Sequence, residues 1–136
     1  MTTRQDLIIR QGETFSFVWT KRDSAGAAVD LSAYTARMAV KDAYNGIRQA
    51  YFSSGADADG GTITLGGAAG TVTLSMTAAQ SAALASELSV ASVMLASQDL
   101  AKPSKTYIYD LELASGSGAV TRELEGRFLV RREVTT

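Results

Sequence analysis

The sequence predicts an all-β fold, either an antiparallel sandwich or a small barrel, with about seven to nine strands and one short helix. Three observations carry this prediction. Apolar and polar residues alternate with a period of two along most of the chain, which indicates sheets with one buried and one solvated face. The alternating segments recur at intervals of roughly 8 to 12 residues, separated by glycine-containing turns. One alanine-rich segment lacks the alternation and is predicted to be helical.

The size and composition indicate one globular domain. The chain has 136 residues, 46% of them hydrophobic, which is enough to bury a core without disulfides or metals. We expect a single domain over residues 1–136, with short flexible ends at 1–5 and 132–136.

The first two strands are separated by a glycine. Asp6–Gln11 is predicted as a strand at the edge of a sheet, and Gly12 supplies the backbone freedom of the turn or bulge that follows. The second strand covers 15–20, and its inward face carries Phe15, Phe17 and Trp19.

A third strand follows a polar turn at 23–26. It covers 35–41, and its inward side chains are Ala36, Met38 and Val40. Leu31 and Tyr34 are expected to anchor the link that leads into it. Asn45-Gly46 is the strongest local turn signal and favours a type I′ hairpin into a strand at 48–52.

The middle of the chain combines a hairpin with the helix. A flexible loop is predicted over 53–61, followed by strands at 62–65 and 71–76. Thr77 and Gln80 have the spacing of a capping box, so a helix is predicted over 78–88. An additional strand is predicted over 89–97.

The C-terminal part predicts the clearest hairpin. One strand covers 105–113, the other covers 120–130, and a Gly-Ser turn joins them. The side chains predicted to face inward are Tyr107, Tyr109, Leu111, Leu113, Leu124, Phe128 and Val130. Gly126 is interpreted as a β-bulge. The charged side chains of 122–127 are expected to face outward and keep an exposed strand soluble.

The absence of two residue types restricts the chemistry. The sequence has no cysteine and no histidine, which excludes Ser-His-Asp and Cys-His catalysis and removes the commonest general base. Asp110 and Glu112 lie on one strand face, but the ordinary interpretation is an exposed face with alternating acids. We therefore expect no enzyme activity, no catalytic residues and no cofactor.

Two loops resemble ligand sites only superficially. Asp57-Ala58-Asp59-Gly60 begins like a calcium loop but lacks the distal glutamate, so no metal site is predicted. The glycines between 60 and 70 lie between strands with no lysine, which favours hairpin turns over a phosphate cradle.

Candidate partner contacts come from two places, the Asn45-Gly46 turn and the apolar segment that follows the helix. Tyr44, Asn45 and Tyr51 surround the predicted hairpin turn, and Val93 and Leu95 lie in the apolar segment after the helix. The aromatic side chains Trp19, Tyr107 and Tyr109 are in phase with the inner face and are expected in the core.

The charge balance argues against two classes of partner. With 13 basic and 14 acidic residues the net charge is −1, so neither a nucleic-acid-binding stripe nor a membrane-binding surface is predicted. No apolar run is long enough for a membrane span, and the N-terminus lacks a signal-peptide profile, so synthesis in the cytoplasm is expected.

The order of several phrases resembles a known group of proteins. These phrases are 6–15 (DLIIRQGETF), 29–38 (VDLSAYTARM), 70–80 (GTVTLSMTAAQ), 107–113 (YIYDLEL) and 120–126 (VTRELEG). Together they resemble small virion structural proteins of tailed bacteriophages and prophages, and the layout is similar to the N-terminal immunoglobulin-like module of phage upper baseplate proteins. The segment 87–104 is longer than in that layout, so residue-level transfer near it is not made.

The resemblance implies an immunoglobulin-like β-sandwich that assembles into a virion. It implies a location in the tail or baseplate, production in the cytoplasm of the bacterial host, several copies per particle, and other virion proteins as partners. Two alternatives stay open: a host-surface carbohydrate- or receptor-binding module of the tail, for which Tyr44 and Tyr51 are the candidate platform, and a capsid decoration or neck protein.

Overall fold

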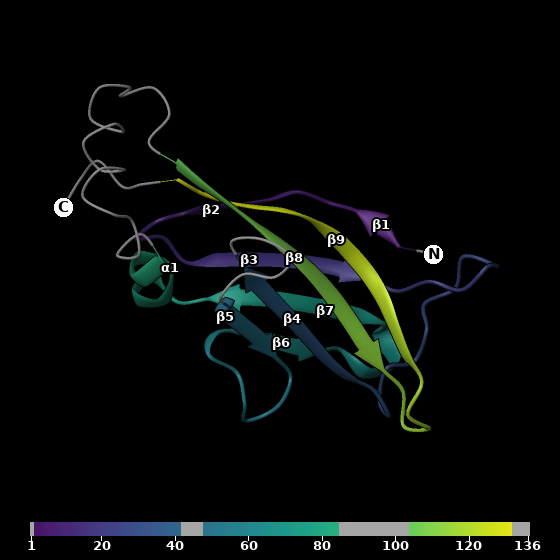
Figure 1. The fold of residues 1–136 in the computed structure, drawn as a ribbon. Coiled ribbons are helices and arrows are strands. Elements are labelled where there is room, and N and C mark those ends of the chain that lie inside the picture. Colours follow the sequence, from purple (N-terminus) through teal and green to yellow (C-terminus); the bar gives the residue numbers. More distant parts are fainter. Residues whose placement is uncertain (1, 42–47, 85–103, 132–136) are drawn as a thin grey trace.

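The computed structural model describes residues 2–41, 48–84 and 104–131 (Figure 1). In chain order the elements are β1 (Thr3–Arg4), β2 (Leu7–Arg10), β3 (Phe15–Thr20), β4 (Thr35–Lys41), β5 (Arg48–Ser53), β6 (Gly60–Leu65), the 3-10 turn η1 (Gly67–Ala69), β7 (Thr71–Met76), α1 (Ala78–Leu84), β8 (Ser104–Ala114) and β9 (Val120–Arg131). The predicted strand at 89–97, the turn at Asn45-Gly46 and the end at 132–136 lie outside the described residues.

The strands form one hydrogen-bonded path in the order β1-β9-β8-β4-β5-β6-β7-β3, and β2 also pairs with β9. The path curls until β6, β7 and β3 lie opposite β4, β8 and β9, with a shared core between them (Figure 1). Successive strands β3 and β4 belong to different layers, as in immunoglobulin-like sandwiches. The predicted all-β, immunoglobulin-like sandwich with one short helix is confirmed for the part of the chain that the structure describes.

Most ladders are antiparallel, and three are parallel. β1 and β2 run parallel to β9, and β5 pairs with β6 in parallel over three residues, from Tyr51 opposite Gly60 to Ser53 opposite Thr62. The β5–β6 pairing joins the two layers into one path. Parallel pairs need no local turn signal, which is why strand patterns alone did not indicate these three ladders.

Inward side chains of both layers form the core, as their alternation predicts. Those that are almost fully buried include Ile9, Met38, Val40, Phe52, Val72, Leu111, Leu113 and Phe128, each 0% exposed. The rings of Phe52 and Tyr109 both meet Phe128 edge to face, with centroids 6.0 and 6.5 Å apart. Such aromatic pairs add to the free energy that apolar burial provides.

The predicted capping box is present at the start of α1. The Gln80 amide N–H donates to Thr77 Oγ1 at 3.1 Å, and the Thr77 amide N–H donates to Gln80 Oε1 at 2.9 Å. Both orphan N–H groups of the first turn are thereby satisfied. The described helix covers 78–84, and the rest of the predicted helix, 85–88, lies outside the described residues.

The loop predicted as flexible over 53–61 is instead partly a strand. Gly60 and Gly61 belong to β6, and Asp59 and Tyr51 exchange backbone hydrogen bonds of 2.7 and 2.8 Å. A Cβ at Gly61 would lie 2.5 Å from the ring of Phe52. Gly61 therefore permits close packing on the aromatic ring, although glycine-rich composition alone favours a loop.

The bulge in β9 lies at Glu123, so the interpretation of Gly126 as a bulge is wrong. Leu111 faces Leu124 and Glu112 faces Arg122, which leaves Glu123 as the extra residue. Gly126 pairs regularly with Tyr109.

The reason for Gly126 is a close approach of the N-terminal segment. A Cβ there would lie 2.5 Å from the carbonyl oxygen of Gln5. That carbonyl accepts a hydrogen bond from the Tyr109 hydroxyl, and the Arg127 amide N–H donates to Asp6 Oδ1 at 3.0 Å. The N-terminal segment, whose first five residues are predicted to be flexible, thus includes the paired strand β1 and lies directly on β9.

The bulge places the side chain of Glu123, which is predicted to face outward, in the interior. Glu123 is 6% exposed, whereas the charges of 122–127 were all expected to face outward. Its Oε1 accepts a hydrogen bond from the Lys21 ammonium at 2.5 Å and another from the Thr121 hydroxyl at 2.9 Å. Lys21 follows β3, so this ion pair connects the two layers.

We predict that Gly126→Ala loosens the N-terminal segment from β9. The added methyl group would overlap the Gln5 carbonyl, and such overpacking costs about 1–3 kcal/mol of unfolding free energy. Urea denaturation measures this cost. The matched control is Gly116→Ala, whose Cβ would lie 3.3 Å from its nearest neighbour and should cost less. Equal losses in the two variants would contradict the account of Gly126.

We predict that Lys21→Met destabilises the fold by about 1–3 kcal/mol, because the Glu123 carboxylate is left buried with the Thr121 hydroxyl alone. A second change, Glu123→Leu, should recover part of the loss because it removes the buried charge. Thermal unfolding of the single and double variants measures both effects. A double variant less stable than Lys21→Met would contradict this role of the ion pair.

Candidate functional site

Of the candidate contact residues, Tyr51 is the one that the structure describes. Tyr44, Asn45, Val93 and Leu95 lie outside the described residues. Tyr51 is half-buried on β5, and the guanidinium carbon of Arg48 lies 4.3 Å from its ring centroid. One face of the ring is therefore covered by a cation, which reduces its suitability as a stacking platform for a sugar.

The carboxylates Asp110 and Glu112 are each paired with an arginine. Arg122 Nε lies 3.3 Å from Asp110 Oδ2, and Arg37 Nε lies 2.8 Å from Glu112 Oε2. The hydrogen bond and charge of Glu112 raise the pKa of Arg37 above its usual value. Two ion-paired carboxylates on an open strand face lack the unequal environments that general acid–base catalysis needs.

The acidic residues of the loop at 57–60 have partners within the protein. Asp57 accepts a hydrogen bond of 2.5 Å from the Ser53 hydroxyl, and Asp59 joins β5 through its backbone. Among residues 2–41, 48–84 and 104–131, no group of three or more acidic side chains is placed to hold a metal ion.

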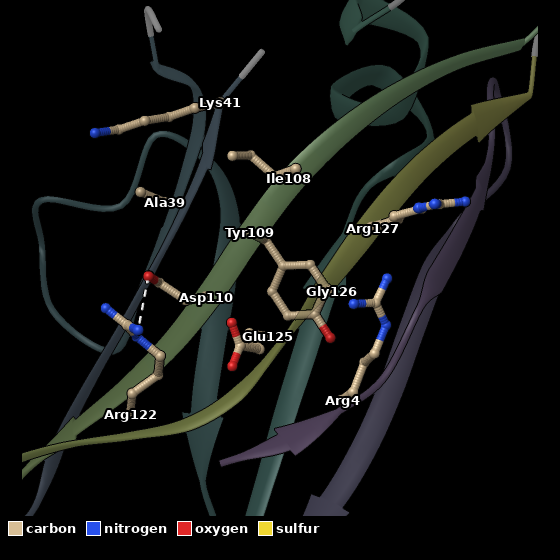
Figure 2. A pocket seen from close by; sticks show the side chains of 10 residues that line it. All are labelled: Arg4, Ala39, Lys41, Ile108, Tyr109, Asp110, Arg122, Glu125, Gly126 and Arg127. Atoms are coloured by element: carbon tan, nitrogen blue, oxygen red, sulfur yellow. Dashed lines mark ion pairs between the residues drawn. The ribbon is translucent and has the colours of Figure 1, made fainter. Parts of the chain in front are cut away.

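A recess lies on the outer face of the layer formed by β4, β8, β9 and β1 (Figure 2). Its volume is about 440 Å³. We call it the basic recess, and it is lined by Arg4, Ala39, Lys41, Ile108, Tyr109, Asp110, Arg122, Glu125, Gly126 and Arg127. Four of these side chains are cationic and two are acidic, so the recess is net positive although the whole chain is not.

The strand register arranges the lining of the recess in rows. One row consists of Lys41, Ile108 and Arg127, which are directly opposite one another on β4, β8 and β9. The next row, one pleat away, consists of Ala39, Asp110, Glu125 and Arg4. In Figure 2, Lys41 and Arg122 lie on one side of Tyr109, and Arg127 and Arg4 lie on the other.

Tyr109 and Gly126 lie opposite one another on β8 and β9, and both line the recess. The Tyr109 residue is 4% exposed, and its hydroxyl donates to the Gln5 carbonyl. Burial, with a smaller effect of the Asp6 carboxylate, raises the pKa of the Tyr109 phenol well above its usual value. The phenol therefore acts as a neutral hydrogen-bond donor that closes the floor.

The second candidate surface is the outer edge of β3. Among the described strands, β3 ends the path and pairs with β7 alone, from Phe15 opposite Met76 to Thr20 opposite Thr71. Val18 on this strand is 56% exposed, one of three large hydrophobic side chains in the described residues that are exposed to this degree; the others are Ile8 at 51% and Val120 at 49%.

Sequence reasoning did not find the basic recess. Its residues come from four strands, and which of them share a row depends on the register and on the bulge at Glu123. The one local signal is Gly126, whose interpretation as a β-bulge does not indicate a recess.

Within the described residues, no helix is both long and apolar enough to cross a membrane.

Comparisons with known proteins find a distant similarity in fold. No protein-family model matches the chain, and no curated protein matches it. Among solved structures, a structure of murine CRIg resembles it with 9% sequence identity over 94% of this chain and 92% of that chain, at a TM-score of 0.40. A likeness this distant says nothing about activity or partners.

We predict that Tyr109→Phe changes the response of stability to alkaline pH. Because the native pKa of this phenol is raised, the unfolded chain releases the proton first above about pH 10. The contribution of the Tyr109 phenol to the free energy of unfolding is complete below that pH and is lost as the pH rises further. At neutral pH the variant should be less stable by about 1 kcal/mol, because it lacks the hydrogen bond. Between about pH 8 and pH 11, urea denaturation should show that the free energy of unfolding declines less steeply in the variant than in the unmodified protein. Parallel declines would contradict the assignment.

Proposed function

We propose that the protein is a non-enzymatic structural protein of a tailed-bacteriophage or prophage virion. In this proposal it lies in the tail or baseplate, is present in several copies, and holds neighbouring subunits. Two observations support it: the ordered phrases between residues 6 and 126 that resemble such proteins, and a sheet edge suited to strand addition.

The edge of β3 is the observation that carries the proposal. Its six residues, Phe15–Thr20, extend over about 20 Å, and within the described part of the chain they have a ladder partner on one side only. Exposed edges of this kind accept a strand from another chain, with backbone hydrogen bonds supplying affinity. Val18 would pack against the incoming strand, whereas Phe15, Phe17 and Trp19 already pack on the core.

The alternative functions receive less support. A carbohydrate-binding module would need an open aromatic platform, and Arg48 covers one face of Tyr51. A capsid decoration or neck protein could use the same edge, so it differs from the leading proposal in its place in the particle. For an enzyme, the sequence offers Asp110 and Glu112 as candidate acids, and both are ion-paired with arginines.

The direct test is to purify phage particles from the bacterium or phage that encodes the chain. Mass spectrometry should detect the protein in a fixed ratio to known tail proteins, and particle imaging should locate it in the tail. Its absence from all particles would overturn the proposal, and a position on the head would select the decoration alternative.

We predict that Val18→Lys reduces incorporation into particles without unfolding the protein. Lysine on an exposed edge opposes strand addition, and this side chain already faces solvent. Incorporation should fall about tenfold, which corresponds to ~1.4 kcal/mol of lost binding free energy. The matched control is Thr64→Lys, an exposed position two strands inward on β6, which should incorporate normally. Normal incorporation of Val18→Lys would show that the β3 edge is not used.

A further inference from the structure

One row of the basic recess carries cations and no acid. Lys41 and Arg127 flank Ile108 on neighbouring strands, so their backbones are about 10 Å apart. Within the described residues, no carboxylate lies within 4.0 Å of either cationic head group. Both long side chains can therefore close on an anion placed over Ile108 without breaking an existing ion pair.

A third cation lies beside the same row. Arg4 on β1 is opposite Glu125, but these two side chains do not form an ion pair. In Figure 2, Arg4 lies on the same side of Tyr109 as Arg127. Arg122 is different, because it is already paired with Asp110 at 3.3 Å. With respect to the described residues, the positive charge of the recess that is not in an ion pair is thus concentrated at Lys41, Arg127 and Arg4.

An apolar strip adjoins the cationic row on its other side. One pleat beyond Arg127, the outward side chain of β9 is Leu129, which lies opposite Ile8 of β2. Leu129 is half-buried and Ile8 is 51% exposed. Ile108 continues this apolar surface into the recess. The cationic row and the pair Leu129 and Ile8 therefore lie one pleat apart on the same face of the sheet.

We propose that the basic recess binds an acidic segment of a partner protein that carries apolar side chains beside its carboxylates. The carboxylates would pair with Lys41 and Arg127, where the forked guanidinium can donate hydrogen bonds to both oxygens of one carboxylate. The apolar side chains would cover Ile108, Leu129 and Ile8. A partner that lacks apolar side chains would leave these three residues in contact with water.

The second row of the recess favours a peptide over a nucleic acid. Asp110 and Glu125 lie one pleat from the cationic row, about 7 Å along the strands. Their charges oppose a continuous chain of phosphates, whereas isolated carboxylates of a peptide can be accommodated over one row. The site shares no strand with the β3 edge, so this inference does not rest on the proposed function.

The test uses the isotope-labelled full chain and a synthetic peptide of glutamate and leucine. Backbone amide signals of Lys41, Ile108 and Arg127 should shift on titration, and the affinity should fall as salt is raised, because the charges are exposed. A peptide of glutamine and leucine should produce no such shifts, and a peptide of glutamate and serine should bind more weakly.

The matched variants are Lys41→Gln/Arg127→Gln and Arg10→Gln/Arg22→Gln, which remove the same charge inside and outside the recess. The first should weaken binding about fivefold, as expected for the loss of two exposed ion pairs. The second should leave binding unchanged.

Three results would overturn the proposal: no shifts in the recess, equal binding of the glutamine peptide, or oligothymidylate binding at least as tightly as the glutamate–leucine peptide. The last result would assign the recess to nucleic acid. The peptide titration uses purified protein, so a negative titration leaves the virion proposal intact. Likewise, absence of the protein from phage particles leaves the peptide result intact.

Discussion

The register of the β8–β9 hairpin is the constraint on which the rest of the outer layer depends. Leu111 faces Leu124, but Glu112 faces Arg122, so the bulge at Glu123 shifts the alternation of β9 by one residue. After the bulge Leu124, Phe128 and Val130 face the core. Without the extra residue, the side chains on one side of position 123 would face the opposite way, because a one-residue slip exchanges the two faces of a strand.

The same bulge has two electrostatic consequences. It places the Glu123 carboxylate in the interior, where the Lys21 ammonium and the Thr121 hydroxyl satisfy it. It also leaves Glu125 and Arg127 facing outward in rows with β8 and β4. The bulge at Glu123 therefore both supplies an ion pair between the layers and determines which charges line the basic recess.

Local patterns predicted much of this fold, and contacts between distant segments account for what they missed. The strand at 35–41 and the capping box at Thr77 and Gln80 depend on neighbouring residues, and both are confirmed. A side chain at Gly126 would collide with the Gln5 carbonyl, and one at Gly61 would collide with the Phe52 ring. Both contacts are with residues that are not neighbours in the sequence. A composition argument assigns such glycines to bulges and loops. The recess was missed for the same reason, because its rows exist only once four strands are in register.

The two candidate surfaces lie on different layers, and this bears on how the protein would assemble. The β3 edge belongs to the layer with β6 and β7, whereas the basic recess covers β4, β8, β9 and β1. A partner strand on β3 would not cover the recess, so under the two proposals one copy would contact two neighbours at once. Two weak contacts held in a fixed relative position give a far higher overall affinity than either alone, provided that both can be made together. An assembly protein built in this way needs no single large apolar interface, and in the described residues its exposed large hydrophobic side chains are indeed scattered over separate strands.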